Sequence, residues 1–214
     1  DFFTEAWSLS VEEYAYLILP LLIFMAFRLF RSGNRQELFF GTTFISIFLL
    51  FIVKLYYYLT VNPIDMAEWS ATFRKVVVYR IDSVYVGFLV VFGIRYYKSY
   101  FDTYKKHFLI AGIALFTFVH LSIFVLQLSP ETHLGFFNLF YLDFVLLSIA
   151  MLVPYFGSLH KGILKNVMVF LSTRSYAMYL VNYSVILLTV QRLGDFQQLS
   201  LWQRCGMVLL FLLL

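Results

Sequence analysis

The chain contains repeated apolar stretches, each about as long as a membrane-spanning helix, and these constrain its fold most. A helix needs about 20 predominantly apolar residues to cross the hydrocarbon core of a bilayer. Six stretches reach such a length, and a seventh begins near Arg204 and is truncated at Leu214. The six are Tyr14–Phe30, Leu38–Val61, Val76–Tyr97, His107–Leu128, Leu134–Phe156 and Val167–Val190. We therefore predict an all-α fold, a polytopic transmembrane helix bundle, over residues 1–214.

The composition excludes most other classes of protein. Hydrophobic residues make up 62% of the chain and charged residues 13%, whereas a soluble domain has about 45–50% and about 25%. Disorder and an ordinary soluble domain are therefore excluded. The single cysteine, Cys205, excludes a disulfide framework and a cysteine-based zinc site. No two histidines have a metal-ligand spacing, so no metal is expected.

The charges of the connecting segments predict the orientation in the membrane. One side carries most of the cations: Arg28, Arg31, Arg35, Arg95, Lys98, Lys105, Lys106, Lys161 and Lys165. The other side carries Arg74, Lys75, Arg192 and Arg204, together with most of the acidic residues. The positive-inside rule assigns the first side, including the connection Arg95–Lys106, to the cytoplasm. Residue Asp1 then lies outside, in the periplasm of a bacterium with an inner membrane. No basic stripe interleaves with exposed aromatics, so no nucleic-acid partner is expected.

Four ionisable side chains lie within the predicted spans, where such groups are costly and indicate function by default. They are Lys54, Arg80, Asp82 and Asp143. Lys54 is close enough to the outer end of its span for its side chain to snorkel to the interface, which we favour. Asp143 is too deep to do so, and a structural carboxylate and a functional one are equally compatible with its position.

Arg80 and Asp82 are two residues apart, so on one helix they do not face each other. Tyr79 and Tyr85 each lie three residues from Asp82 and are candidate hydrogen-bond partners for it. Arg80 then needs a partner on another helix or a water-filled cavity. A structural ion pair between helices and a site open to the outside are both compatible with this pattern.

The segment Trp7–Glu13 allows two interpretations. Ser10 and Glu13 have the Ser-x-x-Glu spacing of a capping box at the start of a helix, and taken alone this interpretation is favoured. Alternatively, Ser8 and Glu12 share one face if the helix extends back that far. A partly desolvated carboxylate at the membrane surface is then a candidate general base.

Three segments, in this order, resemble the membrane acyltransferase-3 family of integral-membrane O-acyltransferases. Glu5–Tyr14, which reads EAWSLSVEEY, resembles the family signature TWSLSVEEQFY. Arg80–Gly87 resembles its Arg-x-Asp-x-x-x-x-Gly segment, and Leu171–Asn182 resembles its IGKISYSLYLWH segment. Two departures are a Ser at position 172 in place of Gly and Asn182 where many members have His. An amide only hydrogen-bonds and does not transfer protons as His does.

The resemblance implies a catalytic role for Glu12 and substrate-binding roles for a wider set. That set is Trp7, Ser8, Ser10, Arg80, Asp82, Ser175, Tyr176, Tyr179 and Asn182. The resemblance also implies acyl-CoA, usually acetyl-CoA, as a donor substrate approached from the cytoplasm, with no bound cofactor. The acceptor is then a hydroxyl of a glycan or lipid-linked sugar at the outer face.

The resemblance covers the chain but only the later part of the family's ten-helix domain. The expectation is therefore a partial acyltransferase-3-like transmembrane domain at residues 1–214, with the early helices and the C-terminus missing. The early helices carry an Arg or Lys followed eleven positions later by a His in this family, so residues 1–214 alone are expected to be inactive. The alternative function is a transporter or flippase of acyl groups or glycan precursors, which performs no chemistry.

Overall fold

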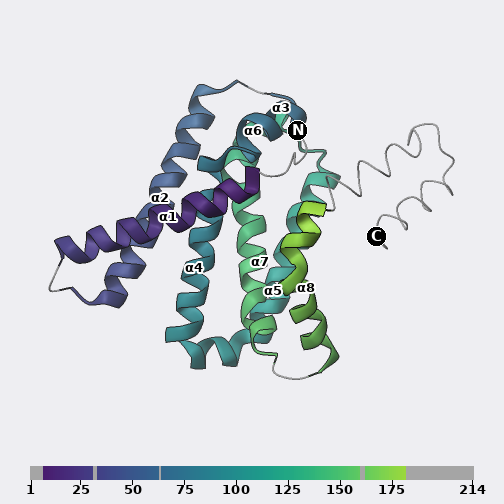
Figure 1. Ribbon diagram of the computed structural model, residues 1–214. Coiled ribbons are helices and arrows are strands. Elements are labelled where there is room, and N and C mark those ends of the chain that lie inside the picture. Colours follow the sequence, from purple (N-terminus) through teal and green to yellow (C-terminus); the bar gives the residue numbers. More distant parts are fainter. Residues whose placement is uncertain (1–6, 31–32, 63, 160–161, 182–214) are drawn as a thin grey trace. The chain divides into compact units, whose positions relative to one another are not determined.

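The computed structural model describes residues 7–30, 33–62, 64–159 and 162–181, and all regular structure within these ranges is helical (Figure 1). The prediction of an all-α fold is confirmed for these residues. The α-helices are α1 (Trp7–Leu29), α2 (Arg35–Thr60), α3 (Met66–Trp69), α4 (Ile81–Tyr96), α5 (Lys98–Val125), α6 (Pro130–Phe136), α7 (Leu142–Gly157) and α8 (Ile163–Val181). Between them lie two π-helical turns, η1 (Ser70–Arg74) and η3 (Phe137–Tyr141), and a 3-10 turn, η2 (Val77–Tyr79).

Five helical segments of the described residues are long and apolar enough to cross a membrane, which makes this a multi-pass membrane protein. They are Trp7–Leu29, Arg35–Thr60, Val77–Tyr96, Lys98–Val125 and Pro130–Gly157. They correspond to the first five predicted spans, with ends that differ by up to nine residues. The sixth span is supported only in part, because α8 is helical but is not among these five, and residues 182–190 lie outside the described residues. The truncated seventh span lies outside them entirely.

The chain divides into two compact units, and each is described by itself. One unit comprises residues 8–160 and contains α1 from Ser8 onward to α7. The other comprises residues 1–7 and 161–214, and its described part is essentially α8. The buried residues discussed below belong to the first unit.

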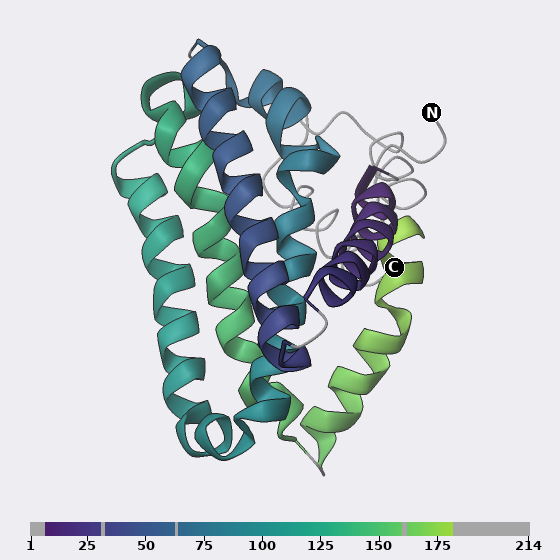
Figure 2. The ribbon, with the colours of Figure 1, turned by 90° about the vertical axis from the view of Figure 1, so that its left-hand side faces the viewer.

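Helices α2, α4, α5 and α7 run side by side in both ribbon views (Figures 1 and 2). Helix α4 packs against α2, α5 and α7, and the most extensive contact is between α5 and α7. Gly112 of α5 allows this close approach, because a Cβ atom there would lie 2.7 Å from the backbone oxygen of Ser148 on α7. Small residues at such contacts are typical of helix pairs in membranes, where close van der Waals packing replaces the hydrophobic effect.

A short helical cap covers the end of the bundle where α2 ends and α4 begins. It consists of α3, η1, α6 and η3, and a cluster of the buried residues Trp69, Phe73, Leu134 and Phe137 holds it together. The Trp69 indole Nε1 donates a 2.8 Å hydrogen bond to the Asn138 side-chain oxygen inside this cluster. The elements α3 and η1 were not predicted, because they are too short to carry a clear helical periodicity, whereas η3 lies within the predicted span Leu134–Phe156.

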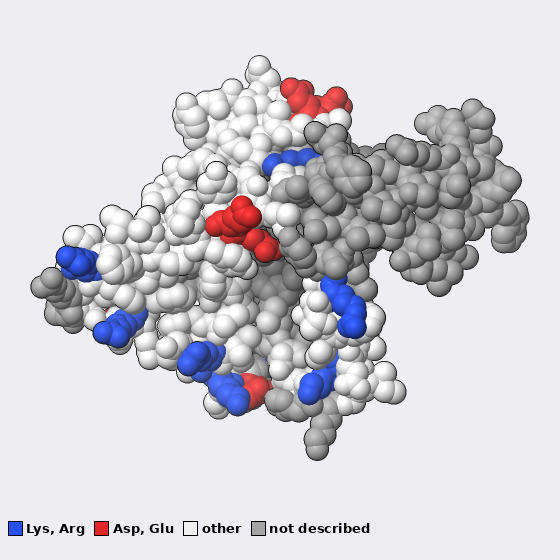
Figure 3. Space-filling model, in the orientation of Figure 1, with Lys and Arg blue, Asp and Glu red and all other residues white. Residues whose placement is uncertain are grey.

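The opposite end of the unit is rich in cations. Figure 3, in the orientation of Figure 1, shows basic side chains at the turn between α4 and α5. The expected loop Arg95–Lys106 is wrong, since α4 ends at Tyr96 and α5 begins at Lys98. Most of these cations therefore lie on helix ends, which still places them where the positive-inside rule requires.

Candidate functional site

A buried lysine between two aspartates joins three membrane-spanning segments. The Lys54 ammonium on α2 pairs with the Asp82 carboxylate on α4 and lies 2.6 Å from Asp143 Oδ1 on α7. The side chains of Lys54 and Asp82 are 2% and 9% exposed, and that of Asp143 is 35% exposed. We call these three residues the Lys–Asp–Asp cluster. In the sequence, Asp82 lies 28 residues after Lys54, and Asp143 lies 89 residues after it.

Irregular backbone adjoins two of the three members. Asp82 lies in the first turn of α4, directly after the 3-10 turn η2 and the non-helical residue Arg80, whose φ is −124° and ψ −12°. Asp143 is the second residue of α7 and follows the π-helical turn η3. Departures of this kind from regular helix geometry often occur at functional sites. Here they bring two carboxylates from different helices to one ammonium.

Arg80 places a second positive charge near the cluster, although among the described residues no ion pair joins it to Asp82 or Asp143. It lies at the N-cap of α4, and its guanidinium interacts electrostatically with both Asp82 and Asp143. Arg80 is outside the regular part of α4, and Asp82 pairs with Lys54 on another helix, which agrees with the expectation that Arg80 and Asp82 need separate partners. Together with Arg80, the cluster contains two cations and two carboxylates, so its formal charges cancel.

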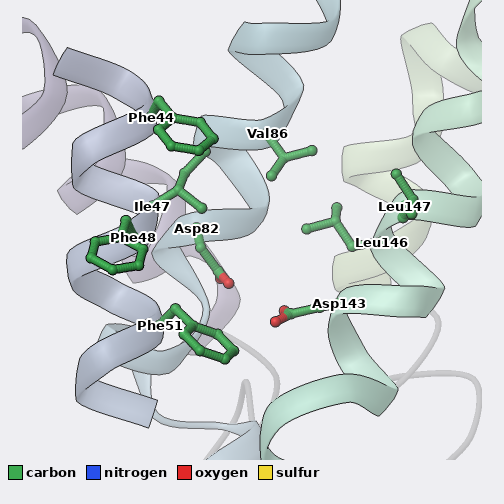
Figure 4. A pocket seen from close by; sticks show the side chains of 9 residues that line it. All are labelled: Phe44, Ile47, Phe48, Phe51, Asp82, Val86, Asp143, Leu146 and Leu147. Atoms are coloured by element: carbon green, nitrogen blue, oxygen red, sulfur yellow. The ribbon is translucent and has the colours of Figure 1, made fainter. Parts of the chain in front are cut away.

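A cavity of about 430 Å³ opens beside the cluster. Figure 4 shows the Asp82 and Asp143 carboxylates directed toward each other from α4 and α7 at this cavity. The rest of its lining is apolar: Phe44, Ile47, Phe48 and Phe51 from α2, Val86 from α4, and Leu146 and Leu147 from α7. A membrane-embedded cavity with polar groups gathered at one place is the usual form of a ligand site.

Two sequence-based expectations about these residues are wrong. Lys54 does not snorkel to the membrane interface, because it is only 1% exposed and its ammonium is paired with Asp82 inside the protein. Asp82 is paired with Lys54 and not with Tyr79 or Tyr85. All four intramembrane ionisable residues stand out in the sequence, but the position of Lys54 near the end of its span predicts an interfacial side chain. A buried charge needs an opposite charge beside it. This requirement would have predicted that Lys54 pairs with the aspartates of other spans.

The segment Trp7–Glu13 is helical, which excludes one of its two interpretations and meets only the geometric condition of the other. Helix α1 already includes Trp7, so Ser10 is inside the helix and the capping box at its start is wrong. Ser8 and Glu12 therefore lie four residues apart on one helix, as the alternative required. Ser8 and Ser10 are half-buried, and Glu12 is exposed. Among the described residues, no hydrogen bond or ion pair links Glu12 to the Lys–Asp–Asp cluster.

The remaining predicted site residues are at the end of the chain, in the other unit. The Ser175 hydroxyl donates a 2.9 Å hydrogen bond to the Ser172 carbonyl on α8 and is exposed. Tyr176 and Tyr179 are within α8, and Asn182 lies outside the described residues. Their predicted role in binding substrate stays a prediction.

Comparisons with protein-family models, with curated proteins and with solved structures give no match. The similarity of the three segments to the acyltransferase-3 family therefore stays a prediction from the sequence.

Proposed function

We propose that this chain is the later part of an integral-membrane acyltransferase of the acyltransferase-3 type. It would transfer an acyl group, in the first instance acetyl, from acyl-CoA to a hydroxyl of an exported or cell-surface carbohydrate. The proposed location is the inner membrane of a bacterium, with the Asp1 end outside. Three ordered sequence motifs support this proposal, and one structural observation carries it further.

That observation concerns the second motif. Asp82, which the resemblance selects together with Arg80, shares the Lys54 ammonium with Asp143. Lys54 and Asp143 were found independently as charges within spans. The cluster they form borders a cavity inside the membrane-spanning segments. A motif retained only for helix packing does not require such a cavity beside its charges.

In the proposed reaction, the acyl group moves from the sulfur of CoA to a hydroxyl oxygen of the acceptor. The acceptor oxygen forms an ester bond to the acyl carbonyl carbon while its proton passes to a base, and the carbon–sulfur bond to CoA breaks. The departing CoA thiolate then takes up a proton. Glu12 would receive or relay the acceptor proton as a general base, with the family's His from the early helices as its expected partner. Arg80 and Asp82 would shape the acceptor side of the site.

The test is the change Glu12→Gln in the complete protein. The amide cannot accept the proton, so acylation should fall by roughly 100-fold or more, while membrane insertion stays normal. Transfer of radiolabelled acetyl groups from acetyl-CoA to glycan measures the effect. Glu13→Gln is the matched control, because Glu13 is also exposed on α1 but points about 100° away. Wild-type acylation with Glu12→Gln would eliminate the catalytic role.

A second candidate, a transporter or flippase, is favoured by the buried charges alone. Ionisable side chains between membrane helices are typical of substrate and proton pathways, and the cluster joins α2, α4 and α7. The same radiolabelled membranes separate the two functions. Covalent label on glycan indicates transfer, whereas translocated but unmodified substrate indicates transport.

A further inference from the structure

The cavity beside the Lys–Asp–Asp cluster lies entirely within the membrane-spanning segments. Every residue that lines it belongs to Arg35–Thr60, Val77–Tyr96 or Pro130–Gly157. Phe48 and Leu147, on opposite walls, are 57% and 44% exposed, so the cavity is open on one side. The opening lies at the depth of the hydrocarbon core, between helices that are long and apolar enough to span it, so a ligand dissolved in the bilayer is the kind of molecule that suits it.

The size and shape of the cavity suit an alkyl chain. A cavity of about 150 Å³ holds benzene, so 430 Å³ accommodates on the order of a dozen carbons by that measure. Its α2 wall runs from Phe44 to Phe51, which is about 10 Å along the helix axis. The polar groups are confined to the carboxylates of Asp82 and Asp143. A ligand that fits is therefore long, apolar and polar at one position only.

The polar end of the cavity selects the kind of polar group. Asp143 Oδ1 is occupied by Lys54, but the side chain is 35% exposed and has further acceptor capacity. An ionised carboxylate away from water needs hydrogen-bond donors. A ligand that contacts it must therefore bring a donor.

The charges at the polar end of the cavity restrict the hydrogen-bond donor of the ligand to an uncharged group. The Lys54 ammonium is 2.6 Å from Asp143 Oδ1, so a cationic ligand at that carboxylate would lie beside a like charge in a medium of low dielectric constant. An anionic ligand would meet two carboxylates at the polar end of the cavity and be repelled. A hydroxyl group satisfies both conditions, since it donates a hydrogen bond and carries no charge.

We propose that this cavity binds the alkyl chain of a lipid alcohol, with its hydroxyl donating a hydrogen bond to Asp143. Binding itself does not depend on any chemistry.

The test uses a photoreactive dodecanol with a diazirine in its chain and the purified complete protein in detergent micelles. Mass spectrometry locates the cross-links, which should concentrate on the α2 wall near Ile47 and on α7 near Leu146. Unlabelled dodecan-1-ol should compete, whereas dodecanoate and dodecane should compete roughly tenfold less or worse. That factor corresponds to one hydrogen bond to a charged group.

Paired variants separate binding from folding. Ile47→Trp fills the cavity and should abolish specific cross-linking. Ile45→Trp makes the same change at a neighbouring α2 residue that is 59% exposed and does not line the cavity, and should leave it intact. Asp143→Asn removes the negative charge, so dodecanoate should then compete about as well as dodecan-1-ol. Gel filtration identifies any variant that is misfolded.

Several outcomes would overturn the proposal. Cross-links scattered over lipid-facing residues would mean adventitious lipid contact only. The absence of cross-links would mean that the alcohol does not bind in the cavity. If dodecane competed as well as dodecan-1-ol, the hydrogen bond to Asp143 would contribute nothing to binding. None of these measurements requires acyl transfer. Specific binding with no acyltransferase activity would therefore contradict the proposed function alone, and activity without binding would contradict this inference alone.

Discussion

At the scale of single residues, Lys54 is the cation that pairs directly with the two carboxylates between the membrane-spanning segments. Its ammonium pairs with Asp82 and Asp143, and it is almost completely buried. Replacing Lys54 with the similarly shaped Met removes the positive charge that is paired with both carboxylates. Breaking a buried pair costs about 3–5 kcal/mol. We therefore expect Lys54→Met to lower the free energy of unfolding in mixed micelles by about that amount.

The control for Lys54→Met is Lys106→Met, which removes an exposed lysine of α5. It should change the free energy of unfolding by no more than about 0.5 kcal/mol. The double variant Lys54→Met/Asp82→Asn should recover part of the stability, because one of the two carboxylates is then neutral. Equal losses for Lys54→Met and Lys106→Met would show that the buried pairing contributes nothing measurable to stability.

The sequence identified the members of this cluster but not their pairing. Lys54, Arg80, Asp82 and Asp143 stand out because charge is rare in spans, which is a local property of the chain. Their pairing depends on how α2, α4 and α7 are rotated against one another, and the partners are up to 89 residues apart. A nearly uniform apolar span carries little information about which face is buried, so neither the cluster nor its cavity could be derived from periodicity.

At the scale of elements, the contact between α5 and α7 depends on Gly112. A Cβ atom at this position would approach a backbone oxygen of α7, which cannot move without displacing the helix. We expect Gly112→Ala to lower the free energy of unfolding in mixed micelles by about 1–3 kcal/mol, as overpacking does. Gly41 of α2 has open space around it, so Gly41→Ala should raise stability by about 0.4–1 kcal/mol. The same sign for both substitutions would contradict this account of the contact.

Element prediction succeeded where length and apolar content decide the outcome. Five of the predicted spans correspond to long helical segments, because an uncharged stretch of about 20 residues has few alternatives in a membrane. It failed where tertiary contacts decide. The cap around Trp69 and the π-helical turn before Asp143 are held by packing and by the hydrogen bond from Trp69 to Asn138. Ser10 and Glu13 had the spacing of a helix start, yet α1 already includes Trp7.

At the scale of the whole molecule, the membrane orientation decides which side of the bilayer the cluster and its cavity are closer to. Lys54 lies six residues before Thr60, the end of α2, which is about 9 Å along the helix axis. If the cation-rich end is cytoplasmic, as the positive-inside rule predicts, the cluster lies in the outer half of the membrane. An acceptor that is modified at the outer face would then meet it there.

Cysteine labelling tests this orientation, because residues 1–214 contain a single cysteine, Cys205, and native cysteines can be replaced by Ser. On that background, Lys98→Cys places a thiol at the exposed first residue of α5 (Lys98–Val125), and Glu131→Cys places one at an exposed residue beyond its other end. A membrane-impermeant maleimide should label Glu131→Cys in intact spheroplasts, and Lys98→Cys only after lysis. Equal labelling of both would mean that α5 does not cross the membrane. The reverse pattern would keep the bundle but move the cluster to the cytoplasmic half, where an acceptor at the outer face could not reach it.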